Sequence, residues 1–445
     1  MNSQFDVVIM GAGMVGASLV SALLNHAKTL DLKIALIEPQ ASPYQAGHNY
    51  EHLNDYQSSF DARSTALSFG SAKIFQQLDI WQQLSLQVQK IEHIHVSDKG
   101  HFGATRLSAK QQNVDALGYV VENQWLGETL LSHIDAHPNR NCLQFYRPAS
   151  VISAKRREGL TQLEIDTEGE SITINAQLLV MADGGRSTLR ETLGFSYKEE
   201  SYQQHALICN LEFDRAHKNI AYERFTDTGP IAMLPLTKQK KRHRNALIWT
   251  LPDAQVDEIQ GLDDNAFMSQ LQQRFGYRSG RIIGVGQRVC YPLKLQVAQE
   301  QVRSGIVLVG NAAHTLHPIA GQGFNLALRG VASLAQHLIA ASAQGKSLGD
   351  LAMLSEFVDN RQADQQMAVN FSDKSMHLFS TNHSLLALGR DLGLQLLDIC
   401  PAAKTVFARS AMGLSSPMPN LRTPQNIDPS KHNELNPTQP TEQGY

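Results

Sequence analysis

Three segments of the chain combine glycine with polar residues in spacings that could hold a dinucleotide. In the first, Gly11, Gly13 and Gly16 have the GxGxxG spacing and follow an apolar run. In such a turn the first glycine permits a tight bend, the second lets a pyrophosphate approach the backbone, and the third lets the next helix pack closely. Glu38 ends the following apolar run, where a carboxylate can accept hydrogen bonds from a ribose diol.

The other two segments lie much later in the chain. In ADGGRS, Asp183 follows an apolar run, and it could contact a pyrophosphate or simply cap an ordinary strand-to-helix turn. In GNAAHTLHPIAGQGFN, the Asn311 amide suits sugar hydroxyls, and the loop with Gly321, Gln322 and Gly323 opens a helix. The N-terminus of that helix would favour a negatively charged ligand.

Histidines near these motifs are candidates for acid and base chemistry. They are His101, His314 and His317. Histidine titrates close to neutral pH, which suits proton transfer, but in a glycine-rich loop it more often packs or caps. Both interpretations stay open from the sequence.

The hydrophobic pattern predicts the elements that position these motifs. Residues 5–10 and 33–38 are short apolar runs typical of buried strands, with a helical pattern between them, so they form a β-α-β unit. Further helices are predicted at 63–90, 123–137, 263–275, 323–342 and 351–413, and strands within 91–120, 162–181 and 197–295. Residues 41–62 are expected to form a loop, and the basic run 238–244 a solvated hairpin tip.

The order of these elements predicts an α/β (α+β) chain of two domains with a helical end. A Rossmann-like dinucleotide-binding domain is expected from 1–196 and 296–345, including some substrate-side strands near 91–120. An antiparallel β-sheet domain for the substrate is expected at 197–295, a C-terminal helical region at 346–414, and a flexible tail at 415–445.

The composition limits the classes of function. A formal charge of −3 over 445 residues gives no indication of nucleic acid binding. Four widely separated cysteines predict neither a metal site nor a disulfide framework, and they fit a reducing, cytoplasmic compartment. No uncharged apolar run approaches the roughly 20 residues needed to span a bilayer, so any contact with the inner membrane is expected to be peripheral.

The three motifs, in this order, resemble those of flavoprotein aromatic hydroxylases of the para-hydroxybenzoate hydroxylase type. Within that superfamily, DARSTALS at 61–68 and AYERFTDTGPIAMLPL at 221–236 resemble the ubiquinone-biosynthesis hydroxylases. The segment GNAAHTLHPIAGQGFNL resembles their 2-polyprenyl-6-methoxyphenol hydroxylase branch. Most members have Gly-Asp where this chain has Gly310-Asn311, and many have Asp in place of Gly330. The Asn311 amide can still hydrogen-bond a ribityl hydroxyl.

The resemblance implies that the protein binds FAD, takes electrons from NAD(P)H and hydroxylates an aromatic ring with O2. Reduced flavin would form a C4a-hydroperoxide whose terminal oxygen passes to an electron-rich ring carbon, so the cofactor carries the chemistry and no catalytic side chain is assigned. The implied substrate is a polyprenylated phenol of ubiquinone biosynthesis, with other proteins of that pathway as partners. Rival hypotheses are a hydroxylase of a small soluble aromatic, and a low-turnover flavoprotein subunit of a biosynthetic complex.

Roles of individual residues follow from the resemblance at matching positions. The ADP half of FAD is assigned to Gly11, Gly13, Gly16 and Glu38. Other cofactor contacts are assigned to Arg63 at the phosphates, Asn123 ahead of a helix, Asp183 at the pyrophosphate, Asn311 at the ribityl chain, and Gly321, Gln322 and Gly323 along the isoalloxazine ring. Substrate contacts are expected from Tyr222, Arg224, His317 and Pro318. The leucine-rich segment 376–413 is amphipathic, and it could dock on a membrane or pack on the FAD-binding domain.

Overall fold

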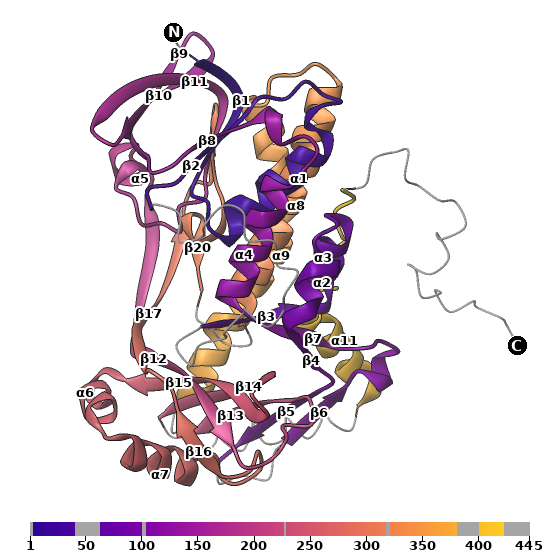
Figure 1. Cartoon of the computed structure of the whole chain (residues 1–445), viewed down its shortest axis with the longest axis vertical. Helices are drawn as coiled ribbons and strands as arrows, with labels where there is room; N and C mark the ends of the chain where they lie inside the picture. Colours follow the sequence, from indigo (N-terminus) through magenta and orange to yellow (C-terminus); the bar gives the residue numbers. More distant parts are fainter. Residues whose placement is uncertain are drawn as a thin grey trace, which may run out of the picture.

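The fold is that of a computed structural model. The structure describes residues 3–40, 63–99, 104–226, 228–316, 321–380 and 400–421. The loop predicted at 41–62 lies outside the described residues, as do His101, His317 and Pro318. Figure 1 shows one sheet at the top, a second at the bottom, and long helices running between them, which confirms the predicted α/β class with a second sheet.

The sheet at the top of Figure 1, here called the first sheet, has a parallel centre. β1 (Ser3–Met10) pairs in parallel with β2 (Ile34–Ile37) on one side and β11 (Glu170–Met181) on the other. β8 (Leu143–Tyr146) and β19 (Ile306–Leu308) extend the parallel order outward. The antiparallel additions are β9 (Ser150–Arg157), β10 (Leu160–Thr167) and β18 (Val302–Arg303). Both faces of such a sheet are covered, so its central strands are apolar at consecutive positions.

Helices cover one face of the first sheet. α1 (Met14–Ala27) follows β1 directly, and it packs between α8 (Gln322–Ala343) and α4 (Asn123–Asp135). Because neighbours surround α1, apolar side chains such as Leu19 and Leu23 are fully buried along it. The β-α-β unit and the helices predicted at 123–137 and 323–342 are confirmed.

A small third sheet corrects the helix predicted across 63–90. That prediction is wrong at both ends, because β3 (Ser64–Ser68) and β4 (Val88–Ile91) both pair with β7 (Gly118–Glu122). Only the middle is helical, in α2 (Phe69–Gln77) and α3 (Trp81–Leu84). Pairing with a strand distant in the sequence decides the conformation here, and a local pattern does not report it.

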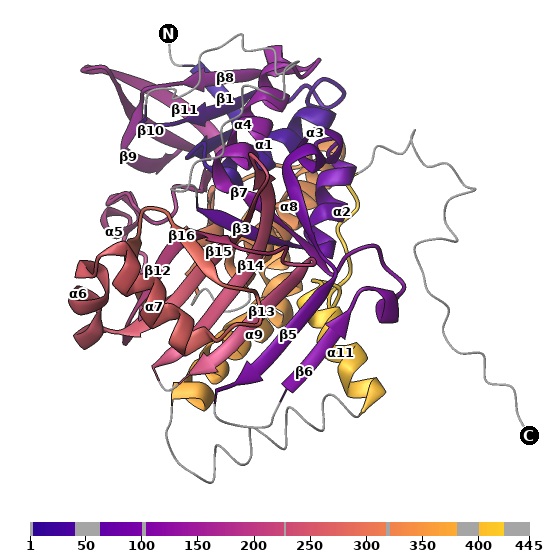
Figure 2. The ribbon, with the colours of Figure 1, turned by 60° about the horizontal axis from the view of Figure 1, so that its bottom comes forward.

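The sheet at the bottom of Figure 1, here called the second sheet, has nine strands and is antiparallel except for one pair. Its order is β20 (His314–Thr315), β17 (Val289–Ala298), β12 (Tyr197–Phe213), β15 (Arg242–Pro252), β14 (Gly229–Gln239), β13 (Ile220–Thr226), β5 (His93–Asp98) and β6 (Ala104–Ser108), with β16 (Ile282–Val285) beside β12. β13 and β5 run parallel, so two strands from the 91–120 region belong to this sheet. Figure 2 shows α6 (Asp253–Gly261) and α7 (Asp264–Phe275) against it, and α7 confirms the helix predicted at 263–275.

The basic run at 238–244 forms a hairpin tip, as predicted, but it is not wholly solvated. Lys240 and Lys241 have positive φ angles of 46° and 70° and join β14 to β15 in a tight turn. Arg244 is fully buried in β15, and its Nη2 donates to Oε1 of Glu122 at 2.8 Å. Glu122 is the last residue of β7, so this buried ion pair joins the second sheet to the small third sheet.

The described residues of the predicted C-terminal helical region form two helices, at 351–380 and 401–411. α9 (Leu351–Ser380) runs beside α8 from β18 of the first sheet to β14 of the second, and α11 (Pro401–Ala411) lies beside β6 (Figures 1 and 2). Leu421, placed in the predicted tail, is buried, and its N–H donates to Oε1 of Gln77 at 2.8 Å. The stretch 415–421 therefore packs on the body of the protein. Among the described helices, none is both long and apolar enough to cross a membrane.

Candidate active site

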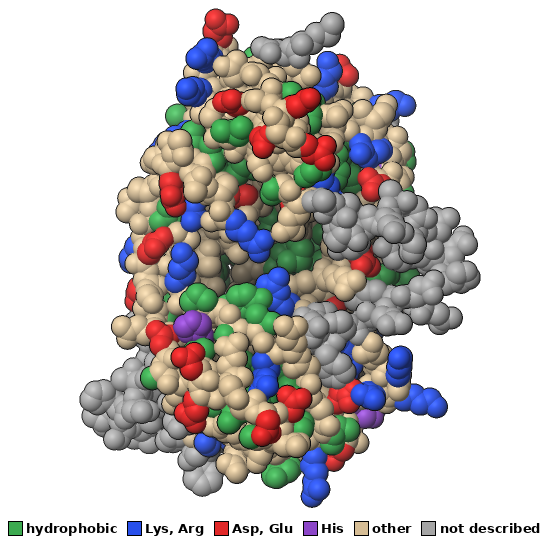
Figure 3. Space-filling model, turned by 60° about the vertical axis from the view of Figure 1, so that its left-hand side comes forward, with side chains coloured by type: hydrophobic (Ala, Val, Ile, Leu, Met, Phe, Trp, Pro, Cys, Tyr) green, Lys and Arg blue, Asp and Glu red, His purple; other side chains and the backbone are tan. Residues whose placement is uncertain are grey.

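A cavity of about 1150 Å³ is lined by residues of all three sheets. Figure 3 shows the molecule hollowed at mid-height, with hydrophobic side chains inside the hollow and Lys and Arg side chains near its edge. The cofactor wall is the part formed by these predicted residues: Gly11, Gly13, Glu38, Arg63, Asn123, Asp183, Asn311, Gly321, Gln322 and Gly323. The substrate wall is the part formed by Ile91, Ile94, Val96, Leu107, Leu117, Ile208, Ala221, Glu223, Phe225, Ala232, Leu234 and Ile248.

The three glycines of the first motif meet different surroundings. Gly11 has a φ of +103°, and a Cβ atom there would lie 2.7 Å from the carbonyl oxygen of Ala182. Gly16 does not line the cavity, since a Cβ on it would lie 1.9 Å from the carbonyl oxygen of Gly11. At Gly13 no protein atom lies within 4 Å of the Cβ position. Gly11 and Gly16 thus serve close packing of the chain itself, whereas Gly13 leaves room for a ligand.

The start of α1 has the properties of a phosphate site. Gly13 is the N-cap of α1, and no side chain caps that end of the helix. The first N–H groups of a helix lack intrahelical partners, and an anion can bind to them. Glu38 lies alongside, and its Oε2 accepts from the N–H of Ala12 at 2.8 Å while its Oε1 accepts from the N–H of Gln40 at 3.0 Å. Each carboxylate oxygen keeps acceptor capacity for a sugar hydroxyl, so these residues fit the ADP half of FAD.

The second motif forms an aspartate-capped turn. Asp183 accepts from the N–H groups of Gly185 at 3.1 Å and Ser187 at 2.9 Å. The helix expected directly after it is wrong, because α5 (Leu189–Thr192) begins later and is a single turn. A Cβ on Gly185 would lie 3.2 Å from the carbonyl oxygen of Asn311, so this turn packs against the third motif. Two segments far apart in sequence therefore meet at the cavity.

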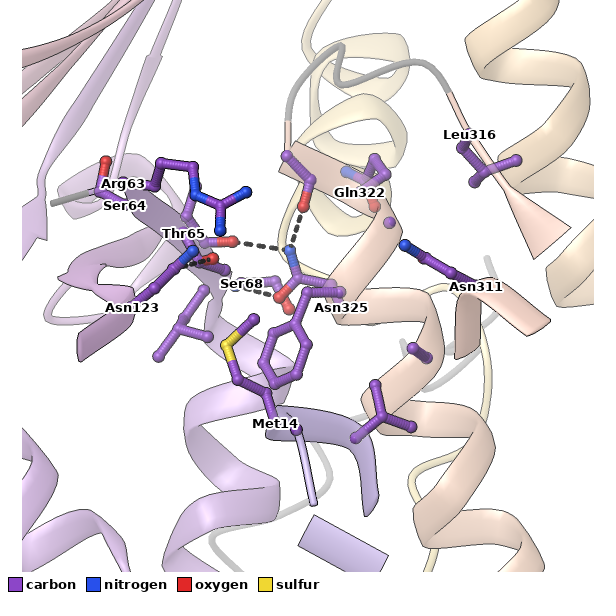
Figure 4. Close-up of a pocket in the computed structure, with 18 of the residues that line it drawn as sticks. Met14, Arg63, Ser64, Thr65, Ser68, Asn123, Asn311, Leu316, Gln322 and Asn325 are labelled. Carbon is purple, nitrogen blue, oxygen red and sulfur yellow. Dashed lines mark hydrogen bonds between the residues drawn. The ribbon is translucent and has the colours of Figure 1, made fainter. Parts of the chain in front are cut away.

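Figure 4 shows Arg63 and Asn311 on opposite sides of the cavity, each pointing toward the other. Asn123 begins α4, and its Oδ1 accepts from the Thr65 hydroxyl at 2.6 Å. The Arg63 guanidinium lies 5.3 Å from the ring centre of Tyr291 in the second sheet. Arg63, Asn123 and Asn311 thus line the same cavity, and the Arg63 side chain also contacts the second sheet.

Asn325 lies within the third motif, and no role is predicted for it above. Its Nδ2 donates to the carbonyl oxygens of Ala66 at 2.8 Å and Gly321 at 2.7 Å. Its Oδ1 accepts from the N–H of Ser68 at 2.8 Å and from the Ser71 hydroxyl at 2.7 Å. Asn325 therefore ties the start of α8 to β3 and to the start of α2, which shapes the cofactor wall.

The two substrate residues predicted on β13 are placed differently relative to the cavity. Tyr222 borders the cavity, but its ring packs against Phe275 of α7 at 5.7 Å between centroids. Arg224 does not line the cavity and lies beside Gly276, at the end of α7. Successive side chains of a strand point to opposite faces, so Glu223 and its alternate neighbours face the cavity instead.

Glu223 is the ionisable residue that the sequence analysis missed. The glutamate lies on β13 within the substrate wall, and burial raises the pKa of its carboxyl from 4.5 to about 7. Its strand was predicted from the sequence, but which of its two faces meets the cavity depends on pairing with β5 and β14. The alternation of side chains along β13 predicts that Glu223 lies on the opposite face from Tyr222 and Arg224, but it does not predict which face meets the cavity.

His314 is buried on β20 and does not line the cavity. Burial, and next the charge of Arg361, lower the pKa of its imidazole from 6.5 to about 4, so the ring is neutral near pH 7. Asp364 accepts from Arg329 Nε at 3.0 Å and from Arg361, which completes a buried ion-pair cluster beside the ring. This placement favours packing over acid or base chemistry for His314.

Comparisons with known proteins show the family to which the chain belongs. The family model described as FAD binding domain matches residues 4–372. The chain is 32% identical to the ubiquinone hydroxylase UbiL of Rhodospirillum rubrum over 92% of this chain and 89% of the relative. It is 27% identical to the 3-demethoxyubiquinol 3-hydroxylase of Escherichia coli over 93% of this chain and 100% of the relative.

A solved structure shares the fold. The p-nitrophenol 4-monooxygenase PnpA from Pseudomonas putida superposes with a TM-score of 0.71 at 15% identity, over 94% of this chain and 99% of that one. The predicted FAD cofactor and the resemblance to ubiquinone-biosynthesis hydroxylases are confirmed by these matches. The chain belongs to the FAD-binding-domain family, within the flavoprotein aromatic-ring monooxygenases that use FAD and NAD(P)H.

Proposed function

We propose that the protein hydroxylates the ring of a polyprenylated phenol, 2-polyprenyl-6-methoxyphenol, in ubiquinone biosynthesis. The relatives named for ubiquinone hydroxylation support the pathway, and the quoted motifs support the branch. FAD supplies the chemistry that activates O2 once NAD(P)H has reduced it. The residues of the cofactor wall would bind that cofactor, and the substrate wall would orient the phenol and exclude water.

The observation that carries the lipid substrate is the extent of the apolar lining. Residues of α9 and α11 line the cavity together with three residues of the substrate wall, and this part of the lining is here called the tail lobe. Its apolar side chains are Ile94, Leu107, Leu117, Met367, Ala368, Phe407 and Ala411. Each CH2 group of a prenyl tail that leaves water for such a surface contributes about 0.8 kcal/mol. A small polar aromatic would leave this lobe unused.

The proposal includes peripheral contact with a membrane through α11. Most of the docking segment predicted at 376–413 lies outside the described side chains, but α11 is described and forms part of the tail lobe. Val406 on this helix is 69% exposed, and Arg409 is exposed next to it. An exposed apolar side chain next to a basic one suits the surface of an anionic bilayer. Other proteins of the pathway are the alternative partners at the same surface.

The test compares phenols that share one headgroup and differ in their tails. We expect kcat/KM for a phenol with a two-isoprene tail to exceed that of the tail-less phenol at least about tenfold. Ala411→Phe should lower this ratio by filling the tail lobe. Ala402→Phe is the matched control, because Ala402 is exposed and lies nine residues away, about half a turn round the helix.

Equal kcat/KM for the tailed and tail-less phenols would contradict the lipid substrate and favour a small soluble aromatic. FAD that binds but is not reduced by NAD(P)H would favour the low-turnover subunit instead. FAD content and thermal unfolding of both alanine variants show whether each is folded before the kinetics are compared.

A further inference from the structure

Tyr222 borders the cavity with its ring packed on Phe275, and the twelve residues that form the substrate wall are apolar except at one position. Eleven of its twelve residues are Ala, Val, Ile, Leu or Phe, and the twelfth is Glu223. On β13 the residues that share its face are Ala221 and Phe225. On the neighbouring strands its register partners are Val96 of β5 and Ala232 of β14, and both also line the cavity. The Glu223 carboxyl therefore lies among apolar side chains in a cavity that can hold a ligand.

Within the described part of the chain, burial is the one cause of the raised pKa of the Glu223 carboxyl, and no hydrogen bond or neighbouring charge contributes to it. A carboxylate in apolar surroundings without a partner is costly, so such a group is a poor choice for stability alone. Because it borders a cavity, a bound ligand can supply the missing partner. A group with these surroundings is a candidate functional residue.

Other charged groups do not account for the properties of Glu223. Charged residues that border the cavity elsewhere are Glu38, Arg63, Arg147, Asp183, Arg186, Arg329 and Asp364. His95 and Arg224 lie on β5 and β13 and alternate with the residues that line the cavity. Burial is the cause that raises the pKa of Glu223 to about 7, so both protonation states are populated near neutral pH.

We infer that Glu223 is the general base that accepts the phenol proton of the substrate, an assignment that rests on the proposed function. The phenol O–H bond breaks, a new O–H bond forms on the Glu223 carboxylate, and the electron pair stays on the phenol oxygen. That pair delocalises to the ring carbons ortho and para to the oxygen. These carbons become more electron-rich, which favours attack by an electrophilic oxygen from O2.

A base with a pKa near the working pH transfers protons most effectively, and such catalysis is typically worth 10²–10⁴-fold. The apolar walls keep the carboxylate from being solvated, and they hold the phenol against it. The same walls bind hydrocarbon without competing for the proton. Glu223 would therefore supply the ionisable contact that fixes the phenol oxygen in the substrate wall.

The first experiment replaces the carboxyl and follows pH. Glu223→Gln should lower kcat/KM for hydroxylation about 10²-fold. In the wild type kcat/KM should rise with pH through about 7, as the base loses its proton, and this step should vanish in the variant. Glu223→Asp should retain part of the rate. Glu258→Gln is the matched control, since Glu258 is exposed on α6, away from the cavity.

A series of phenols separates a base from a structural residue. Phenols with electron-withdrawing substituents ionise more readily and need less help from a base. The wild-type to Glu223→Gln ratio of kcat/KM should therefore shrink as the phenol becomes more acidic. A ratio of one throughout, or an unchanged ratio across the series, would overturn the assignment of Glu223 as the base.

A binding measurement keeps this assignment distinct from the proposed function. If the wild type hydroxylates none of the phenols, the proposed function fails, and the absorbance of bound 4-nitrophenol still decides the role of Glu223. In the wild type its ionisation should follow a coupled titration of two groups, and in Glu223→Gln a titration of one group. Identical curves for the two proteins would overturn the assignment.

Discussion

The cofactor wall and the substrate wall of one cavity are built on different physical principles. The cofactor wall adds polar side chains to exposed backbone: a glycine turn, the uncapped start of α1, and an aspartate-capped turn. The substrate wall presents side chains from alternate positions of strands, and these are apolar apart from Glu223. Backbone recognition requires particular residue types in fixed spacings, whereas a hydrocarbon surface can be built from many sequences. The cofactor wall can therefore be recognised as a motif in the sequence, and the substrate wall cannot.

The glycines of the first motif allow the sharpest test of this contrast. Gly13→Val should abolish FAD binding, raising its Kd at least about 100-fold, because the new side chain occupies space that a pyrophosphate would use. The apoprotein should lose only about 1 kcal/mol, the cost of a poor N-cap residue. FAD content after purification and urea unfolding of the apoprotein measure the two effects.

The same substitution at Gly16 should act through the fold instead. A Cβ there would lie 1.9 Å from the Gly11 carbonyl oxygen, so α1 must move away from β1. Overpacking of this kind costs about 3 kcal/mol or more. Full FAD content in Gly13→Val, or equal stability of the two apoproteins, would contradict the distinction between a ligand-facing and a packing glycine.

This contrast also explains what the sequence could predict. The β-α-β unit, the order of the three motifs and most helices follow from periodicity and glycine spacing, which are local. The third sheet, the parallel pairing of β13 with β5, and the facing of Glu223 depend on strands distant in sequence. Tyr222 and Arg224 are predicted to contact the substrate because their strand is expected on the substrate side, and of the two only Tyr222 borders the cavity.

The buried Arg244–Glu122 ion pair tests how firmly the second and third sheets, which contribute to the two walls, are joined. Arg244→Met should destabilise the protein by about 3–5 kcal/mol, because it leaves the Glu122 carboxylate buried without its partner. Adding Glu122→Met should restore most of that loss. Urea unfolding of the two single variants and the double variant measures the coupling.

Arg242→Met is the control for this pair on the same strand. Arg242 donates to Glu212 at 2.6 Å, but its side chain is 62% exposed, so the loss should stay within about 1 kcal/mol. Equal losses for Arg242→Met and Arg244→Met would show that burial does not decide the worth of these pairs. Packing, and not the buried ion pair, would then hold the second and third sheets together.

The last prediction concerns how the free energy of unfolding depends on pH. His314 has a folded pKa of about 4 against 6.5 in the unfolded chain, so between these values the unfolded state binds more protons. Stability from this group is complete above pH 6.5 and is lost as the pH falls toward 4, by at most about 3 kcal/mol. His314→Asn should flatten that part of the curve of unfolding free energy against pH.

Glu223 should tilt the same curve the other way. Its folded pKa of about 7 lies above the ordinary 4.5, so the folded state binds more protons between these values, and stability falls as the pH rises through that window. Glu223→Gln should remove this fall, so the variant gains stability relative to the wild type near pH 7. In the wild type the two slopes oppose each other between pH 4.5 and 6.5, and only the single variants reveal them.

His314→Asn should change this curve but leave the pH dependence of kcat/KM near 7 in place, because His314 does not line the cavity. If His314→Asn also removed the step in kcat/KM near pH 7, that step would belong to His314 and the buried ion-pair cluster beside it. The substrate wall would then contribute no titrating group.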